Sequence, residues 1–331
     1  MSSNLVRIGI RSFAGLAITC SVLTAAIGED WPTRPVTIVV PLAAGGGSDG
    51  LVRVLAPRLG ELLGHQVIVE IVGGAGGMIG ASRVAKAAPD GYQVLLGTSG
   101  TQTHSQSLYA KPLYDAVNDF TPVSLIFEVP QVLMARNSLP ADNLREFIAY
   151  ARDHQSAMQF GSSGAGGTGH IGCALLNAAA ELNITHIPYR GGGPAMTDLI
   201  AGRIDYQCAL VNIAKPQIDA KSAKGLAMLA LTRSPIMPDL LTAQEQGFGE
   251  FDASAWNGIF LPRGAPAAVV EKLRAALVAT METPEVRARL IELGATMMPP
   301  ERQSPRYLQD FVEREIAKGG EIMKAAKLTP K

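Results

Sequence analysis

The sequence lacks an excess of charge of either sign. Its 331 residues carry 29 basic and 29 acidic side chains, so the formal net charge is zero. A nucleic-acid binder normally presents a basic surface to the phosphates, and this balance does not provide one. We therefore expect no nucleic acid among the partners. The apolar fraction of 47% and the charged fraction of 18% exclude an intrinsically disordered chain and are typical of a folded globular protein.

Cysteine is also scarce, and the histidines show no pattern. Three cysteines exclude a disulfide scaffold and a structural zinc cluster. Cys173 and Cys208 are able to pair in an oxidising compartment, and two buried thiols are the equal alternative. No histidine pair has a metal-ligand spacing such as H-E-x-x-H, so no metal is expected. The histidines are His65, His104, His154, His170 and His186.

Long apolar runs are absent beyond the N-terminus, where residues 1–28 predict an export signal. Arg7 and Arg11 precede the apolar run Ser12–Ile27, which is too short to span a bilayer comfortably. Small residues before Gly28 predict cleavage near Ala26–Gly28. The alternative is a membrane anchor that stays attached. We expect an exported, soluble mature chain.

The length and the pattern of apolar residues predict an α/β protein with two lobes, because a single core rarely grows to this size. Strands are predicted at 36–40, 67–72, 92–98, 122–127, 131–135, 158–161, 185–189, 204–211, 225–232 and 259–261. Helices are predicted at 51–64 with a break at Pro57, at 78–88, 144–154, 171–182, 195–201 and 215–220, and over most of 265–327. The alternation of short strands and helices favours parallel βα units. The extended segment 122–135 is predicted to cross between the lobes, and 225–232 to cross back.

Glycine is abundant, and its placement is informative. Of 35 glycines, 18 fall into four clusters, each after a predicted strand and before a predicted helix. The clusters are Gly45, Gly46, Gly47 and Gly50; Gly73, Gly74, Gly76, Gly77 and Gly80; Gly161, Gly164, Gly166, Gly167, Gly169 and Gly172; and Gly191, Gly192 and Gly193. Such loops lie at the carboxyl ends of strands, where α/β proteins bind ligands. Bare backbone N–H groups and helix N-termini there predict an anion site, and tight turns with helix caps are the alternative.

Named glycine motifs fit poorly. Gly164–Gly169 matches G-x-G-x-x-G, but the preceding strand is short and no acidic residue stands clearly about 20 residues further on. No cluster ends in Gly-Lys-Ser/Thr, so a P-loop is absent, and no cofactor is expected. Gly46–Gly50 matches the hydrolase elbow G-x-S-x-G, which makes a secreted serine hydrolase using Ser48 the enzyme alternative. Because Pro41–Gly45 separates that serine from its strand, we expect no enzyme.

Eight segments in order along the chain carry a resemblance to a known family. They are Trp31–Pro41, Gly45–Asp49, Gly74–Gly80, Pro89–Tyr92, Asp119–Val123, Phe160–Gly164, His186–Ala195 and Asp198–Asp205. With these segments the chain resembles the periplasmic receptors of tripartite tricarboxylate transporters, the Bug receptors. The resemblance covers nearly the whole chain after the predicted signal.

The resemblance implies a two-lobed, Venus-flytrap fold of the periplasmic-binding-protein type II class. Each lobe is expected to be a mostly parallel sheet flanked by helices, with residues 29–123 plus 234–331 in lobe 1 and residues 124–233 in lobe 2. It implies a monomeric periplasmic receptor that delivers a small organic carboxylate to a permease of one large and one small integral-membrane subunit. A ligand-sensing co-receptor for a signalling system is an alternative that the sequence leaves open.

The resemblance also implies which residues bind the ligand. Those of the first lobe are Pro41, Leu42, Ala43, Gly46, Gly47, Asp49, Gly74, Gly76, Gly77, Ser99 and Thr101. Those of the second lobe are Ser162, Gly167, Thr168, Tyr189, Arg190, Gly191 and Gly192. His170 is added from its position just after the third glycine loop, where it is the one histidine expected to face the cleft; a local hydrogen bond at the start of a helix is the alternative.

Three departures from the family pattern bear on the ligand. Ile71-Val72-Gly73 replaces the Asn-Arg-Pro of many relatives, which removes a fixed positive charge. Arg190 stands where Lys is common and is suited to bidentate recognition of a distal carboxylate. Ala209 stands where relatives that bind acidic amino acids tend to place an Asp. We therefore predict a di- or tricarboxylate or an aromatic acid without an α-amino group, and the sequence does not identify it further.

Overall fold

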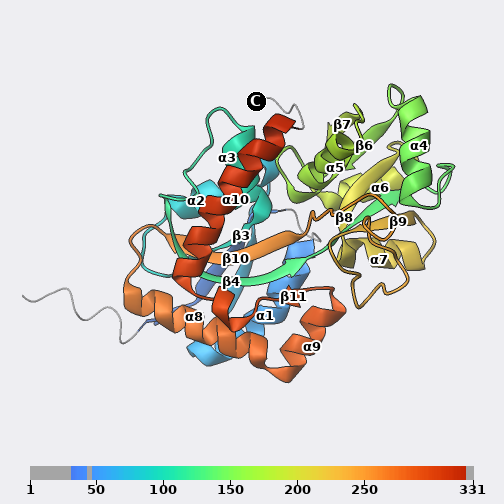
Figure 1. Cartoon of the computed structure of the whole chain (residues 1–331). Helices are drawn as coiled ribbons and strands as arrows, with labels where there is room; N and C mark the ends of the chain where they lie inside the picture. The colour runs from blue at the N-terminus through green and yellow to red at the C-terminus, as the bar shows by residue number, and fades with distance from the viewer. Residues whose placement is uncertain (1–30, 43–46, 326–331) are drawn as a thin grey trace, which may run out of the picture.

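The computed structural model describes residues 31–42 and 47–325, and in them two β-sheets flanked by helices form two lobes (Figure 1). The predicted export signal and its cleavage site near Ala26–Gly28 lie outside the described residues. None of the helices in these residues is long and apolar enough to cross a membrane.

Sheet A, of six strands, is the centre of the first lobe and has the order β11-β4-β10-β3-β1-β2. Its strands are β1 (Val36–Val40), β2 (Val67–Ile71), β3 (Gln93–Thr98), β4 (Phe120–Val129), β10 (Ala255–Pro262) and β11 (Thr296–Met297). Its helices are α1 (Gly47–Leu63), α2 (Met78–Ala85), α3 (Ser105–Leu108), α8 (Ala267–Glu282), α9 (Pro284–Glu292) and α10 (Pro305–Ala325). Short turns of other helix types are η1 (Ala75–Gly77), η2 (Gly100–His104) and η3 (Pro300–Arg302).

Sheet B, of five strands, is the centre of the second lobe and has the order β7-β6-β8-β5-β9. Its strands are β5 (Gln131–Ala135), β6 (Gln159–Ser162), β7 (Thr185–Pro188), β8 (Tyr206–Leu210) and β9 (Lys224–Leu229). Its helices are α4 (Leu144–His154), α5 (Thr168–Ala179), α6 (Gly192–Ile200) and α7 (Val211–Asp219). Helix α4 begins where the side chain of Asn143 accepts a hydrogen bond from Glu146 N–H, an N-cap that satisfies one free donor of the first turn.

Helix α1 illustrates how the apolar pattern sets the packing. Leu51, Leu55 and Leu59 recur every four residues and are fully buried, so one stripe of the helix faces the core. The sequence predicts a break at Pro57, and this prediction is wrong, because α1 continues through Pro57 to Leu63. Burial of the leucine stripe on both sides of the proline outweighs the loss of one backbone hydrogen bond.

The two sheets are mixed, which corrects the expectation of mostly parallel sheets. β1 pairs parallel with β2 and β3, and β6 pairs parallel with β7 and β8. β10 is antiparallel to β3 and β4, and β5 is antiparallel to β8 and β9. A strand buried on both faces is apolar whatever its direction, so the residue pattern of β5 and β10 does not reveal which way they run.

The chain passes between the sheets twice. β4 lies wholly in sheet A and β5 wholly in sheet B, so the first crossing falls at Pro130 (Figure 1). The predicted lobe boundary between residues 123 and 124 falls inside β4. β9 pairs with β5 in sheet B and does not cross back as predicted for 225–232. The chain returns to the first lobe between residues 230 and 254. This stretch contains the predicted lobe boundary between residues 233 and 234.

The two lobes pack against each other. One continuous apolar core includes Leu51 of α1 and Val129 of β4 together with Met196 of α6 and Ala214 of α7. Both sheets therefore contribute to a common core at the level of the crossing strands, and this holds the facing loops of the two lobes close together.

Candidate ligand-binding site

A cavity lies between the lobes where the glycine loops of the two sheets face each other. The volume of this cavity that is open to the centre of a water molecule is about 70 Å³. The lining residues come from both lobes: Leu42, Gly47, Ser48, Gln131, Ser162, Ser163, Thr168, Gly169, Gly191, Gly192, Gln207, Cys208, Ala209, Leu210 and Ile213. We call this the interlobe cavity.

Four helices begin at the interlobe cavity. The first residues of α1, α5 and α6 line it, namely Gly47, Thr168 and Gly192. Leu210, the residue before α7, lines it as well. A helix N-terminus carries free N–H groups and a positive partial charge, so the four ends together favour an anion. Among the described lining residues no side chain is charged, so backbone and hydroxyl dipoles supply the polarity.

The start of α1 is connected to α7 of the other lobe. The side-chain amide of Asn212 donates a hydrogen bond to the backbone carbonyl of Gly47 at 3.0 Å. A Cβ atom at position 47 would lie 2.6 Å from Asn212 Oδ1 and 2.6 Å from Leu210 Cδ1. A larger residue there would require the Asn212 and Leu210 side chains to shift.

The second glycine cluster makes a different contact. A Cβ atom at Gly76 would lie 2.2 Å from the carbonyl oxygen of Ala165, so η1 of the first lobe touches the loop before α5 of the second. The hydroxyl of Tyr109 donates to the same carbonyl at 3.1 Å. Gly76 therefore makes a lobe-to-lobe contact, whereas Gly74 and Gly77 pack against Ile79, Pro41 and Thr101 of their own lobe. None of the three lines the described cavity.

The structure brings some of the predicted site residues together and not others. Those that line the interlobe cavity are Leu42, Gly47, Ser162, Thr168, Gly191 and Gly192. Those that do not are Pro41, Asp49, Gly74, Gly76, Gly77, Ser99, Thr101, Gly167, His170, Tyr189 and Arg190. Ala43 and Gly46 lie outside the described residues.

Asp49 and Thr101 make hydrogen bonds to residues near them in the sequence and stabilise local structure. Asp49 lies in the first turn of α1 and accepts a hydrogen bond from Arg53 Nε at 2.7 Å. A carboxylate in this turn stabilises the helix, and the ion pair with Arg53 offsets its negative charge next to an anion site. Thr101 exchanges hydrogen bonds with Thr98 at the end of β3, and its side chain is fully buried.

His170 lies behind the third glycine loop. Its Nδ1 accepts a hydrogen bond from Gly166 N–H at 3.1 Å, and its ring stacks on His186 with 3.9 Å between centroids. His186 Nε2 is in turn 2.7 Å from Ser162 Oγ. The histidine pair therefore holds the loop whose other side, with Ser162, lines the interlobe cavity.

Tyr189 and Arg190 lie beside the cavity on the loop before α6. The hydroxyl of Tyr189 donates to Asp198 Oδ2 at 2.8 Å, and Asp198 also pairs with Arg203. Burial, followed by the hydrogen bond to the Asp198 carboxylate, raises the pKa of Tyr189 to about 12. Arg190 is exposed to solvent.

Sequence reasoning missed several lining residues, above all Gln131, Gln207 and Cys208. Gln131 is the one polar residue in the apolar run Val129–Ala135, and this isolation is the sequence signal that could have identified it as a site residue. Gln207 and Cys208 lie on β8, and their place in the cavity depends on the pairing of β8 with β5 and β6. Cys208 forms a disulfide with Cys173 of α5, an outcome that the sequence left open.

Ser48 does not have the surroundings of a nucleophile. Its hydroxyl donates to Asn257 Oδ1 at 3.2 Å, and it is buried. No histidine is among the described residues that line the interlobe cavity, so a general base is lacking there. The serine hydrolase alternative therefore finds no support. In the described part of the chain, no three His, Cys, Asp or Glu side chains cluster in a way that could hold a metal ion.

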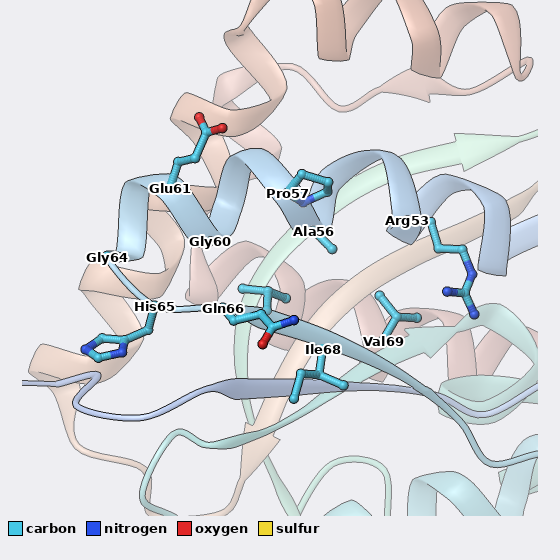
Figure 2. A pocket seen from close by; sticks show the side chains of 11 residues that line it. Arg53, Ala56, Pro57, Gly60, Glu61, Gly64, His65, Gln66, Ile68 and Val69 are labelled. Carbon is cyan, nitrogen blue, oxygen red and sulfur yellow. The ribbon is translucent and has the colours of Figure 1, made fainter.

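A larger hollow, of about 880 Å³, lies on the outer side of the first lobe between α1 and β2 (Figure 2). All its lining residues fall between Arg53 and Val69, and they come from one lobe. Arg53 and His65 lie at opposite ends of this hollow, and the Glu61 side chain points away from β2 (Figure 2). Because its polar groups do not converge, the interlobe cavity is the better candidate site.

Comparisons with known proteins agree with this geometry. The family model described as tripartite tricarboxylate transporter family receptor matches residues 51–328. The structure of MatC from Rhodopseudomonas palustris with bound malate has a TM-score of 0.84 and 37% identity, and covers 88% of this chain and 99% of that one. The structure of the periplasmic binding protein BugD has a TM-score of 0.86 and 36% identity, covering 91% of this chain and all of that one.

A third structure, Rpa4515 of R. palustris with adipate, has a TM-score of 0.86 and 34% identity, and covers 91% of this chain and 100% of that one. The family model spans most of the chain, and the solved structures share its two-lobed fold along nearly their whole length. The chain therefore belongs to the tripartite tricarboxylate transporter receptor family and is a solute-binding receptor of the Bug type.

Proposed function

We propose that this protein captures a small organic carboxylate, without an α-amino group, in the interlobe cavity. The observation that carries the proposal is the convergence of four helix N-termini on a cavity lined, among the described residues, by no charged side chain. Free N–H groups at these ends stabilise a carboxylate by charge-assisted hydrogen bonds. Solvent exclusion between the closed lobes strengthens each of these bonds.

The lining of the cavity argues against an amino acid ligand. Ala209 lines it, and no acidic side chain does so among the described residues. An ammonium group buried there would lack a counter-charge, and burying an unpaired charge is strongly unfavourable. Malate in MatC and adipate in Rpa4515 are both dicarboxylates without an amino group.

Ligand capture by such a receptor requires the lobes to open and close. We assign the described residues up to 129 and from 255 onward to lobe 1 and residues 131–229 to lobe 2, with the hinge at Pro130 and in the return segment 230–254. The hydrogen bonds Asn212–Gly47 and Tyr109–Ala165 join the lobes and would break on opening. The ligand shifts this equilibrium by binding groups of both lobes at once.

Membership of the receptor family supports the place of the protein in transport. We propose an exported, monomeric, periplasmic receptor that passes its ligand to a permease of one large and one small integral-membrane subunit. It performs no catalysis in this role.

A thermal-shift screen of carboxylates on the mature chain tests the proposal. A ligand at 100 times its dissociation constant adds about 2.7 kcal/mol of stability, which such a screen detects. Malate, adipate, citrate and phthalate cover the expected classes. Stabilisation by at least one of them, and by neither aspartate nor glutamate, is expected. Stabilisation by none of them would contradict the proposal.

The variant Ala209→Asp sharpens the test. It places a carboxylate at the cavity, so it should weaken binding of a dicarboxylate by about tenfold or more through like-charge repulsion. Aspartate, which carries an ammonium group, should lose less affinity or gain some. If Ala209→Asp changed both affinities equally, position 209 would not face the ligand.

A further inference from the structure

The side chain of Gln131 connects the hinge to a helix whose first residue lines the interlobe cavity. Gln131 is the first residue of β5, directly after the crossing at Pro130, and it is 1% exposed. Its Nε2 donates a hydrogen bond to Ala253 O at 2.6 Å and a second one to Thr168 O at 3.3 Å. Both hydrogens of the amide nitrogen are therefore used on backbone carbonyls, and this fixes the orientation of the amide.

The carbonyl of Ala253 belongs to the segment that returns to the first lobe. Ala253 N–H donates to Leu229 O of β9 at 2.9 Å, so both backbone groups of Ala253 are held by the second lobe. β10 of sheet A begins two residues further on. The Gln131 amide therefore ties the two crossings together where they leave the second lobe, and Ser254 is the one residue between this tie and β10.

The second carbonyl belongs to the first turn of α5. Thr168 is the first residue of this helix and lines the interlobe cavity. The amide packs against the same face of α5 one turn later, because a Cβ atom at Gly172 would lie 2.7 Å from Gln131 Oε1 and 2.8 Å from its Nε2. The absence of a side chain at Gly172 is what lets the amide reach the helix.

A second close approach holds the same end of α5. A Cβ atom at Gly169 would lie 2.5 Å from the carbonyl oxygen of Cys208 on β8. The first turn is therefore held from two sides, by the backbone of β8 and by the amide of Gln131. The N–H groups of residues 168–170 have no acceptor within the helix, so this turn is the part of α5 that offers donors to an anion.

We propose that Gln131 is a positioning residue of the ligand site. Its amide holds the first turn of α5 at a fixed place relative to the hinge, so closure of the lobes brings the N–H donors of this turn to the ligand. Because its nitrogen already donates to two carbonyls, Gln131 acts through the end of α5. Its effect on affinity rests on the proposed capture of a carboxylate, whereas its contact with Gly172 is testable without a ligand.

The variant Gln131→Met tests the positioning role, because methionine keeps the length of the side chain and removes both hydrogen bonds. We expect the affinity of the mature chain for malate or adipate, whichever binds more tightly, to fall about fivefold or more by calorimetry. Gln303→Met is the matched control: Gln303 is also buried and its Nε2 donates to Met298 O at 2.6 Å, but it does not line the interlobe cavity. No loss for Gln131→Met, or an equal loss in both variants, would overturn the proposal.

Backbone amide signals in a magnetic resonance spectrum separate positioning from a general loss of structure. In the unaltered protein the saturating dicarboxylate should shift the N–H signals of Thr168 and Gly169 and those of Gly47 and Gly192 at two other helix ends. In Gln131→Met we expect smaller shifts at Thr168 and Gly169 and unchanged shifts at the other two. Shifts reduced equally at all three helix ends would contradict a role confined to α5.

The substitution Gly172→Ala tests the contact in the absence of a ligand. At a helix position with open space, alanine in place of glycine raises the unfolding midpoint, by about 2 °C in a chain of this size. Here the added Cβ requires the amide of Gln131 to shift, which disturbs its bonds to Ala253 and Thr168, so we expect the midpoint to fall. In the background Gln131→Ala the amide is gone, and Gly172→Ala should raise the midpoint.

The sign of the effect of Gly172→Ala decides the outcome. The same sign in both backgrounds would overturn the positioning role, even if no carboxylate bound the protein. A reversal of sign in a protein that binds no carboxylate would support the contact of Gln131 with α5 and contradict the proposed function alone.

Discussion

Asn212 on α7 of the second lobe donates a hydrogen bond to the carbonyl of Gly47, the first residue of α1 in the first lobe. The bond joins the N-terminal turn of one helix to the N-terminal turn of another on opposite lobes. It therefore brings two positive helix ends towards one space, an arrangement that an anion between them stabilises. We therefore expect this contact to couple closure of the lobes to binding of a carboxylate.

Gly47→Ala should weaken ligand binding without unfolding the protein. The added Cβ would lie 2.6 Å from Asn212 Oδ1 and from Leu210 Cδ1, so both side chains must shift and the Asn212–Gly47 hydrogen bond between the lobes is disturbed. We expect the affinity for the best carboxylate to fall at least about tenfold, or 1.4 kcal/mol, by calorimetry. Gly50→Ala in the same helix is the control, because a Cβ atom at this exposed position would have no other atom within 4 Å. Equal affinities of both variants would show that Gly47 makes no essential close approach.

The extent to which the sequence predicts this site depends on how local each feature is. The leucine spacing predicts α1, and the glycine clusters predict the loops at Gly47, Thr168 and Gly191, because these are properties of neighbouring residues. The contact of Gly76 with Ala165 and the place of Cys208 depend on which strands are adjacent and how the lobes meet. Residues far apart in sequence decide those features, so no local pattern contains them.

Opening of the Cys173–Cys208 disulfide should reduce both stability and ligand affinity. The bond ties α5 to β8 over a sequence separation of 35 residues, which corresponds to about 3–4 kcal/mol of chain entropy in the unfolded state. Cys208 also lines the interlobe cavity, so the ligand loses a fixed wall. Urea unfolding of the oxidised protein and of the double variant Cys173→Ser/Cys208→Ser measures the difference. Unchanged stability and affinity in the double variant would show that the bond does not constrain the site.

Stability should fall as the pH is lowered from about 6.5 towards 4. Burial, with a contribution from nearby His170, holds the pKa of His104 in the folded protein at about 4, below the ordinary histidine value of 6.5. The unfolded chain then binds more protons than the folded one between these values, so acid favours unfolding and the stability returns as pH rises. Thermal unfolding midpoints across this range measure the slope.

The variant His104→Gln should make that slope shallower, because the group that titrates differently in the two states is gone. His154→Gln is the control, since His154 is exposed on α4 and stacks only on its neighbour Tyr150 among the ring contacts of the described residues. If the slope survived His104→Gln and disappeared with His154→Gln, the buried ring would not be its source.

The most direct test of the account is titration calorimetry of the mature chain with malate, adipate and L-aspartate in the same buffer. Four helix ends and an interlobe cavity without a charged side chain among its described residues predict saturable binding of at least one of the two dicarboxylates. They also predict that L-aspartate, whose ammonium finds no counter-charge, binds at least about tenfold more weakly. Tight binding of L-aspartate, or no binding of either dicarboxylate, would contradict the account.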